Sequence, residues 1–226
     1  MKRIFKYSLA LVLLLGASSL SLANETGYEV ELIIFENANG RYLNSEDWSF
    51  NDKIEHKVNE ALPDNPISND KEFKELDWNS ARLAKNLNHL LKNNNYKVLV
   101  HKRWKQTGLD RKESLNIPIN TRPAEQANNS STENAEIIGN INPETKLESY
   151  ITGDVRLIMS RYLHFNVNLK FFKPLLNNNA EYEFKPFPVI SERRMKSKEI
   201  HYIDHPLVGV VVLATPYKIK TEESGS

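Results

Sequence analysis

A long alternation of apolar and polar residues at positions 155–171 constrains the fold more than any other feature of the sequence. A period of two residues is typical of a β-strand that buries one face. At about 3.3 Å per residue, a single strand of this length is too long for a small domain, so we expect a bend or a bulge within it. A bulge near Arg161 would move that side chain off the core face, which the other odd positions define: Val155, Leu157, Met159, Leu163, Phe165, Val167, Leu169 and Phe171.

Other segments carry strand and helix patterns. We expect strands at residues 28–35, 96–104, 187–202 and 210–214, with turns at 177–179 and 204–209. A helix is predicted after Asn79 or Ser80 as cap; its buried face would carry Leu83, Leu87, Leu90 and Leu91. A shorter helix is predicted before Pro63, from the spacing of Ile54, Val58, Ala61 and Leu62.

These elements predict an α+β fold, a mostly antiparallel sheet with one or two helices packed on one face. The opening strand, helix and strand predict a parallel crossover between residues 28–35 and 96–104. Residues 24–226 are expected to form a single domain, with polar loops near 37–70 and 106–146.

The amino end is typical of a cleaved secretory signal peptide at residues 1–23. It begins with positive charges, continues with an apolar run at 9–15, and ends with the small residues Ser21 and Ala23 near the expected cleavage site. The apolar run is shorter than the roughly 20 residues that a transmembrane helix needs. No later segment is apolar and long enough to span a bilayer, so we expect no membrane insertion.

The chain contains no cysteine. A bacterial lipoprotein needs a cysteine at its new amino terminus, so we expect a periplasmic protein without a lipid anchor and without disulfides. Cleavage would remove three positive charges and change the formal net charge from +1 to −2. Such a balance implies no strongly basic face, and we expect no nucleic acid as partner.

Most of the unusual side chains lie in the carboxyl-terminal third. His201 and His205 flank Asp204 with the spacing of an inverted zinc-peptidase motif, but that motif requires a helix, and Pro206 disfavours helical backbone before it. Zinc also needs three or four converging ligands. We therefore expect no metal and no other cofactor, and we interpret these histidines as hydrogen-bonded groups at a strand end and turn.

The basic residues between Arg193 and Lys198 have two interpretations. Lysine often guards an exposed strand against edge-to-edge pairing. Alternatively, arginine holds the carboxylates of cell-wall peptide stems, and aromatic rings such as Tyr162, Tyr202, Trp104 and Trp78 stack on sugars. Each aromatic residue taken alone also fits packing in the core or at a sheet edge.

Four segments carry a resemblance to the CsiV family: YEVELIIF at 28–35, YKVLVHKRW at 96–104, SRYLHF at 160–165 and RMKSKEIHYIDHPLVGVVV at 194–212. The resemblance runs from residue 28 to about residue 217. CsiV proteins are periplasmic, peptidoglycan-binding proteins of gammaproteobacteria, named for cell-shape integrity. The resemblance implies binding to the wall, and support of a class A penicillin-binding protein through its lipoprotein activator.

The clustering of polar and aromatic residues in these motifs predicts a ligand-binding site made of Arg161, Tyr162, His164, Arg193, Lys196, His201, Tyr202, Asp204 and His205. Two structural roles compete with it. Asp204 could cap the turn before Pro206, and Arg161 could pair with Asp204 or Glu199 to fix strand register.

Three functions remain open from the sequence. A non-enzymatic wall-binding protein is expected to sediment with peptidoglycan in a salt-sensitive way. A metal-dependent cell-wall hydrolase would release soluble fragments and would lose activity on chelation. A protein–protein adaptor without wall affinity would do neither and would present an exposed apolar patch.

Overall fold

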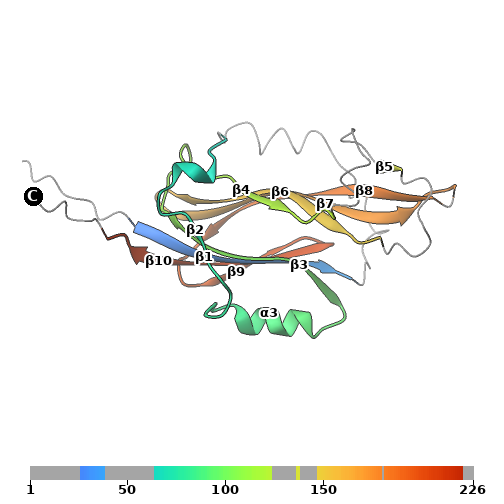
Figure 1. Ribbon diagram of the computed structural model, residues 1–226, viewed down its shortest axis with the longest axis horizontal. Coiled ribbons are helices and arrows are strands. Elements are labelled where there is room, and N and C mark those ends of the chain that lie inside the picture. Colours follow the sequence, from blue (N-terminus) through green and yellow to red (C-terminus); the bar gives the residue numbers. More distant parts are fainter. Residues whose placement is uncertain (1–25, 39–63, 124–135, 138–146, 180, 221–226) are drawn as a thin grey trace, which may run out of the picture.

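The computed structural model describes residues 26–38, 64–123, 136–137, 147–179 and 181–220. In this part of the chain, two five-stranded antiparallel sheets pack face to face, and the α-helix lies on the outer side of one of them (Figure 1). The expected residues 1–23 of the signal peptide and the short helix near 54–62 lie outside the described residues.

Sheet A contains the first and last strands of the described chain. Its strand order is β2 (Lys74–Glu75), β3 (Tyr96–Thr107), β1 (Thr26–Asn37), β10 (Val208–Lys218) and β9 (Ile200–Asp204). Sheet B contains β4 (Ile117–Asn120), β6 (Tyr150–Met159), β7 (Leu163–Leu176), β8 (Tyr182–Met195) and β5 (Glu136–Ile137), in that order. A 3-10 turn, η1 (Ile67–Asn69), precedes β2, and α3 (Ala84–Leu91) follows it.

The main core lies between the two sheets. Alternate residues of the central strands β1 and β7 point into it: Val30, Leu32 and Ile34 from β1, and Phe165, Val167, Leu169 and Phe171 from β7. This is the apolar face that the alternation at 155–171 predicts. The mostly antiparallel arrangement is confirmed, but the strands divide between two sheets because both apolar faces need a partner.

A second core lies between sheet A and α3. Ile33, Phe35 and Leu213 on the outer face of the sheet contact Leu83, Leu87 and Leu90. Leu91, predicted to share this face, is instead 62% exposed. It is the last residue of the helix and lies at the margin of the leucine stripe, where it faces solvent.

A buried carboxylate from β1 determines where α3 begins. Glu31 is 1% exposed, and its two oxygens accept the backbone N–H groups of Arg82 at 3.0 Å and Leu83 at 2.7 Å. The predicted caps, Asn79 and Ser80, lie earlier in the chain, and Leu83 at the cap position makes no side-chain cap hydrogen bond. A negative charge at this end also interacts favourably with the helix dipole.

The prediction that residues 28–35 and 96–104 run parallel is wrong, because β1 and β3 pair antiparallel. The helix returns the chain to the end of the sheet where β1 finished: the Ala38 N–H donates to the Asn95 carbonyl, and Asn37 pairs with Tyr96. A chain that leaves and re-enters a sheet at the same end must run back along its neighbour.

The bend expected near Arg161 is a complete reversal of the chain. β6 ends at Met159 and β7 begins at Leu163, and the Ser160 N–H donates to the Tyr162 carbonyl within the turn. β6 then pairs along its whole length with residues 163–172 of β7. The same inward-facing alternation therefore belongs to two adjacent strands, and Arg161 is exposed at their turn.

The strand expected at 187–202 also divides. β8 pairs with β7 in sheet B, and β9 pairs with β10 in sheet A. Residues 196–199 connect the sheets, and the Lys198 N–H donates to the Ala214 carbonyl at 2.8 Å. The turn expected at 204–209 joins β9 to β10.

No helix in the described part of the chain has the length and apolar character that a bilayer crossing would require.

Candidate functional site

The nine residues predicted as a site lie in three places. Three are at the β6–β7 turn and on the outer face of sheet B: Arg161, Tyr162 and His164. Three are at the connection from β8 to β9: Arg193, Lys196 and His201. The last three are at the outer face of sheet A and the β9–β10 turn: Tyr202, Asp204 and His205.

Tyr162 at the β6–β7 turn interacts with two arginines. The guanidinium carbon of Arg194 lies 3.3 Å from the centre of its ring, and that of Arg161 lies 5.8 Å away. Such contacts between a cation and an aromatic face are attractive. Arg194 already occupies this ring face, so the face is not available for stacking on a sugar.

His164 belongs to a polar cluster around Glu192. Its Nδ1 atom lies 3.2 Å from Glu192, and Arg111 donates two hydrogen bonds to the same carboxylate. Hydrogen bonding from Arg111 lowers the pKa of Glu192 below its usual value. The carboxylate ties the loop that carries Arg111 to sheet B, so its oxygens are used structurally.

The connection from β8 to β9 presents exposed cations. The Lys196 N–H donates to Nε2 of His201 at 3.0 Å, which fixes the imidazole against the connection. The Lys196 side chain is 79% exposed and only 3.6 Å from Glu199, and Arg193 is exposed as well. Arg193 and Lys196 are therefore exposed cations that can meet carboxylates from outside.

Tyr202 and His205 make local contacts. The Tyr202 hydroxyl donates to Asp204 at 2.8 Å, its ring stacks on Phe35 at 6.3 Å, and burial raises its pKa. The Leu207 N–H donates to Nδ1 of His205 at 3.3 Å, and burial lowers the pKa of that imidazole. Among the residues that the structure describes, no three metal-ligating side chains gather to hold an ion.

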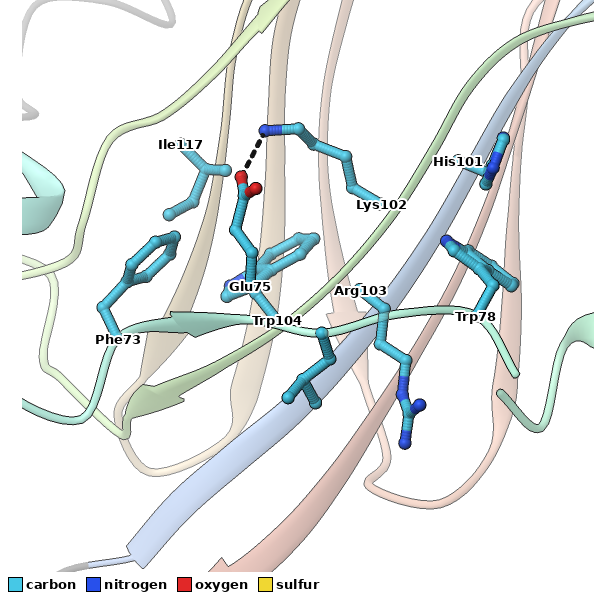
Figure 2. A pocket seen from close by; sticks show the side chains of 9 residues that line it. Phe73, Glu75, Trp78, His101, Lys102, Arg103, Trp104 and Ile117 are labelled. Atoms are coloured by element: carbon cyan, nitrogen blue, oxygen red, sulfur yellow. Dashed lines mark hydrogen bonds and ion pairs between the residues drawn. The ribbon is translucent and has the colours of Figure 1, made fainter. Parts of the chain in front are cut away.

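A pocket of about 170 Å³ lies beside β3, where β2 ends (Figure 2). β2 pairs with β3 only at Lys74 and Glu75, and the chain then leaves the strand. Two of its lining residues, Glu75 and Lys102, form an ion pair of 3.0 Å (Figure 2). The remaining lining residues are Phe73, Leu76, Trp78, His101, Arg103, Trp104 and Ile117.

Arg103 fixes the segment that carries Trp78. Its guanidinium donates to Glu29 at 2.7 and 2.9 Å, to the Asp77 carbonyl at 2.8 Å and to the Ser80 hydroxyl at 2.8 Å. In Figure 2 this group points away from Glu75 and Lys102. Arg103 therefore acts as a structural clamp, and only its stem lines the pocket.

The two described tryptophans differ in their hydrogen bonding. Trp104 is 1% exposed, and its indole N–H donates to Gln106 at 2.8 Å inside the core. The indole N–H of Trp78 is buried and has no acceptor among the described residues. Trp78 also packs edge to face against His101 at 5.3 Å.

The sequence indicated Trp78 as a possible sugar contact, but it gave no signal for Phe73, Glu75 or Lys102 as parts of one pocket. Residues 73–75 precede the predicted helix and lack a strand pattern. Their pairing with β3 depends on the tertiary fold.

Comparison with known proteins identifies one family. The family model described as "Peptidoglycan-binding protein, CsiV" matches residues 6–217, nearly the whole chain. Neither the curated proteins nor the solved structures contain a match. The match extends over every described strand except the last residue of β10. This chain belongs to the CsiV family.

Proposed function

We propose that this chain is a periplasmic, non-enzymatic protein that binds peptidoglycan and supports cell-wall synthesis and cell shape. The family match over residues 6–217 carries the proposal, because that family is described by peptidoglycan binding. Under this proposal, its protein partners are a class A penicillin-binding protein and the lipoprotein activator of that synthase.

The connection between β8 and β9 supplies the chemistry for the peptide part of the wall. Arg193 and Lys196 are exposed cations, and stem peptides end in free carboxylates. His201 positions the connection through its bond to the Lys196 backbone. Charge-assisted hydrogen bonds from this segment would hold the stem peptide at the surface.

The contacts of Glu192, His201 and His205 support binding by this part of the molecule rather than catalysis. Arg111 and His164 occupy the carboxylate of Glu192, and ring nitrogens of His201 and His205 accept backbone N–H groups. A general base needs a ring nitrogen or carboxylate free to take a proton from its substrate. These groups serve the fold instead.

The periplasmic location rests on the expected signal peptide, residues 1–23. Mass spectrometry of a periplasmic fraction tests it. A mature chain that starts at Asn24 supports export and cleavage, whereas an intact amino terminus in the cytoplasmic fraction contradicts both.

Sedimentation with purified peptidoglycan sacculi tests the binding function. We would compare residues 24–226 with a variant carrying Arg193→Ala, Lys196→Ala and His201→Ala. A matched control carries Lys85→Ala, His89→Ala and Lys92→Ala, which removes the same kinds of charge from exposed positions on and just after α3. Circular dichroism would verify that all three proteins fold.

We expect the parent and the helix control to sediment with sacculi and the β8–β9 variant to remain largely in solution. Equal binding by all three proteins would show that the contact with peptidoglycan lies outside the β8–β9 connection. Failure of the folded parent to sediment at low salt would overturn the peptidoglycan proposal.

A further inference from the structure

We propose that the pocket beside the end of β2 binds one N-acetylated sugar ring of the glycan strand. This inference rests on the proposed peptidoglycan-binding function and assigns the glycan to a site that differs from the cationic β8–β9 connection. Glu75, Trp78 and Lys102 are the residues expected to contact the sugar.

The size of the pocket selects a single ring. A dry cavity of about 150 Å³ is known to hold one benzene molecule, so a six-membered ring fits a space of this order. The present pocket is partly open to solvent and has a volume of about 170 Å³. One pyranose ring can therefore enter, while the next sugar of the strand must lie outside.

The walls offer the two kinds of contact that a sugar requires. Phe73 and Ile117 lie on one side of the pocket and Trp78 on the other (Figure 2), and such apolar surfaces suit the C–H faces of a pyranose. Glu75 and Lys102 supply an acceptor and a donor at 3.0 Å from each other. Neighbouring sugar hydroxyls can donate to the carboxylate and accept from the ammonium.

The indole of Trp78 favours a sugar that carries an acetamido group. Its buried N–H has no acceptor among the described residues, and buried donors in proteins normally have one. The carbonyl oxygen of an N-acetyl group is a strong neutral acceptor. A sugar that places this oxygen against the indole edge would satisfy the donor, whereas a plain hexose lacks the amide carbonyl.

The charges of the pocket favour a neutral ligand over a stem peptide. Glu29, Asp77 and Ser80 accept hydrogen bonds from four of the five N–H donors of the Arg103 guanidinium, and Glu75 pairs with Lys102. A carboxylate entering here would have to compete with Glu75 for its cation. A neutral sugar can bridge the ion pair without breaking it.

The pocket is also held in shape before a ligand arrives. The Leu76 N–H donates to the Arg103 carbonyl at 2.8 Å, and the Arg103 side chain fixes the residues on either side of Trp78. A preformed wall lowers the entropy lost on binding.

The test is a titration of ¹⁵N-labelled residues 24–226 with N-acetylglucosamine, followed by NMR through the indole N–H signals of the three tryptophans. Trp78→Phe assigns the relevant signal, and glucose is the control for the acetamido group. Lys102→Ala removes the ammonium group that we expect to contact the sugar. Lys97→Ala is its matched control, because Lys97 lies on the same strand with a similar ion pair of 3.1 Å to Glu148.

We expect a saturable shift of the Trp78 signal with N-acetylglucosamine and little change at Trp104. We expect Lys102→Ala to weaken binding about tenfold, as loss of a charged hydrogen bond does, and Lys97→Ala to bind like the parent. Equal shifts with glucose would overturn the assignment of the N-acetyl group.

The outcomes separate this inference from the proposed function. A parent protein that sediments with sacculi but shows no saturable Trp78 shift would overturn the sugar site and leave peptidoglycan binding intact. A Trp78 shift caused by a free stem peptide and not by the sugar would also overturn it. A parent that binds neither sacculi nor sugar would overturn both.

Discussion

At the scale of the residue, buried carboxylates on β1 fasten other elements to the central strand. Glu31 holds the start of α3. Glu36 points the opposite way, into the space between the sheets, where it pairs with Lys173 of β7 at 2.7 Å and accepts from Ser149. One strand thus anchors the helix on its outer face and sheet B on its inner face through acidic side chains.

Replacing Glu31 tests the helix anchor. We expect Glu31→Ala to lower the free energy of unfolding by about 2–4 kcal/mol, because two backbone N–H groups lose their acceptor in a buried site. Denaturation in urea measures the change. Glu199→Ala, at an exposed ion pair, is the control and should cost less than about 1 kcal/mol. A loss for Glu31→Ala as small as the control's would show that the helix needs no anchor.

His205 makes stability depend on pH. Burial lowers the pKa of His205 below 6.5, so the unfolded chain binds more protons between the lowered pKa and 6.5. Stability therefore rises with pH through this window and is lost as the pH falls through it. We expect a smaller free energy of unfolding at about pH 5 than at about pH 8, within the range where histidine titrates.

Two variants check the assignment to His205. His205→Gln removes the titrating ring and should flatten the profile between these two pH values. His89→Gln, at an exposed position on α3, should keep the profile of the parent. An unchanged slope in His205→Gln would assign the pH dependence to another group.

Some site residues were predictable one by one, and their grouping was not. The motifs indicated Arg193, Lys196 and His201 because charge and aromatic content are visible in the sequence. Glu75 and Lys102 look like ordinary surface residues until β2 pairs with β3 and places them 3.0 Å apart. A sequence shows the chemistry of each side chain, but convergence depends on pairings between distant segments.

At the scale of the element, Gly153 permits the close pairing of β6 with β7. Its φ of +127° is a conformation that other residues rarely adopt, and an added Cβ would meet the carbonyl oxygen of Asn168. We expect Gly153→Ala to cost about 2 kcal/mol or more. Thermal or urea unfolding measures it, with Thr152→Ala on the same strand as the control; equal costs would contradict a special role for the glycine.

The alternation at 155–171 predicted which residues of β7 face the core, but it did not show that the segment divides into two antiparallel strands. The phase of an alternation can also change within one strand. Ile34 of β1 pairs with Val100 of β3, and the next residue, Phe35, pairs with Val98. Leu99 is therefore an extra residue in β3. Val98 then packs under α3 while Val100 faces the main core. The sequence does not mark this bulge, because Val98, Leu99 and Val100 are all apolar.

At the scale of the whole molecule, the two proposed contacts with the wall differ in their response to salt. Raising the salt from about 0.1 M to about 1 M shortens the screening length from ~10 Å to ~3 Å. We expect this change to weaken sedimentation with sacculi, which depends on exposed Arg193 and Lys196. The Trp78 shift with N-acetylglucosamine should persist, because the sugar is neutral. Salt-independent sedimentation would contradict a role for carboxylate contacts.

The place of β1 in sheet A has a consequence for when the protein can fold. β1 lies between β3 and β10, and its register with β10 joins the two ends of the described chain, from Thr26 with Lys218 to Glu36 with Val208. Contacts this distant in sequence form slowly, because closing the loop costs entropy first. The central strand therefore lacks one neighbour until the final strand is available. For a chain exported as we propose, this order delays completion of sheet A until almost the whole polypeptide has crossed the membrane.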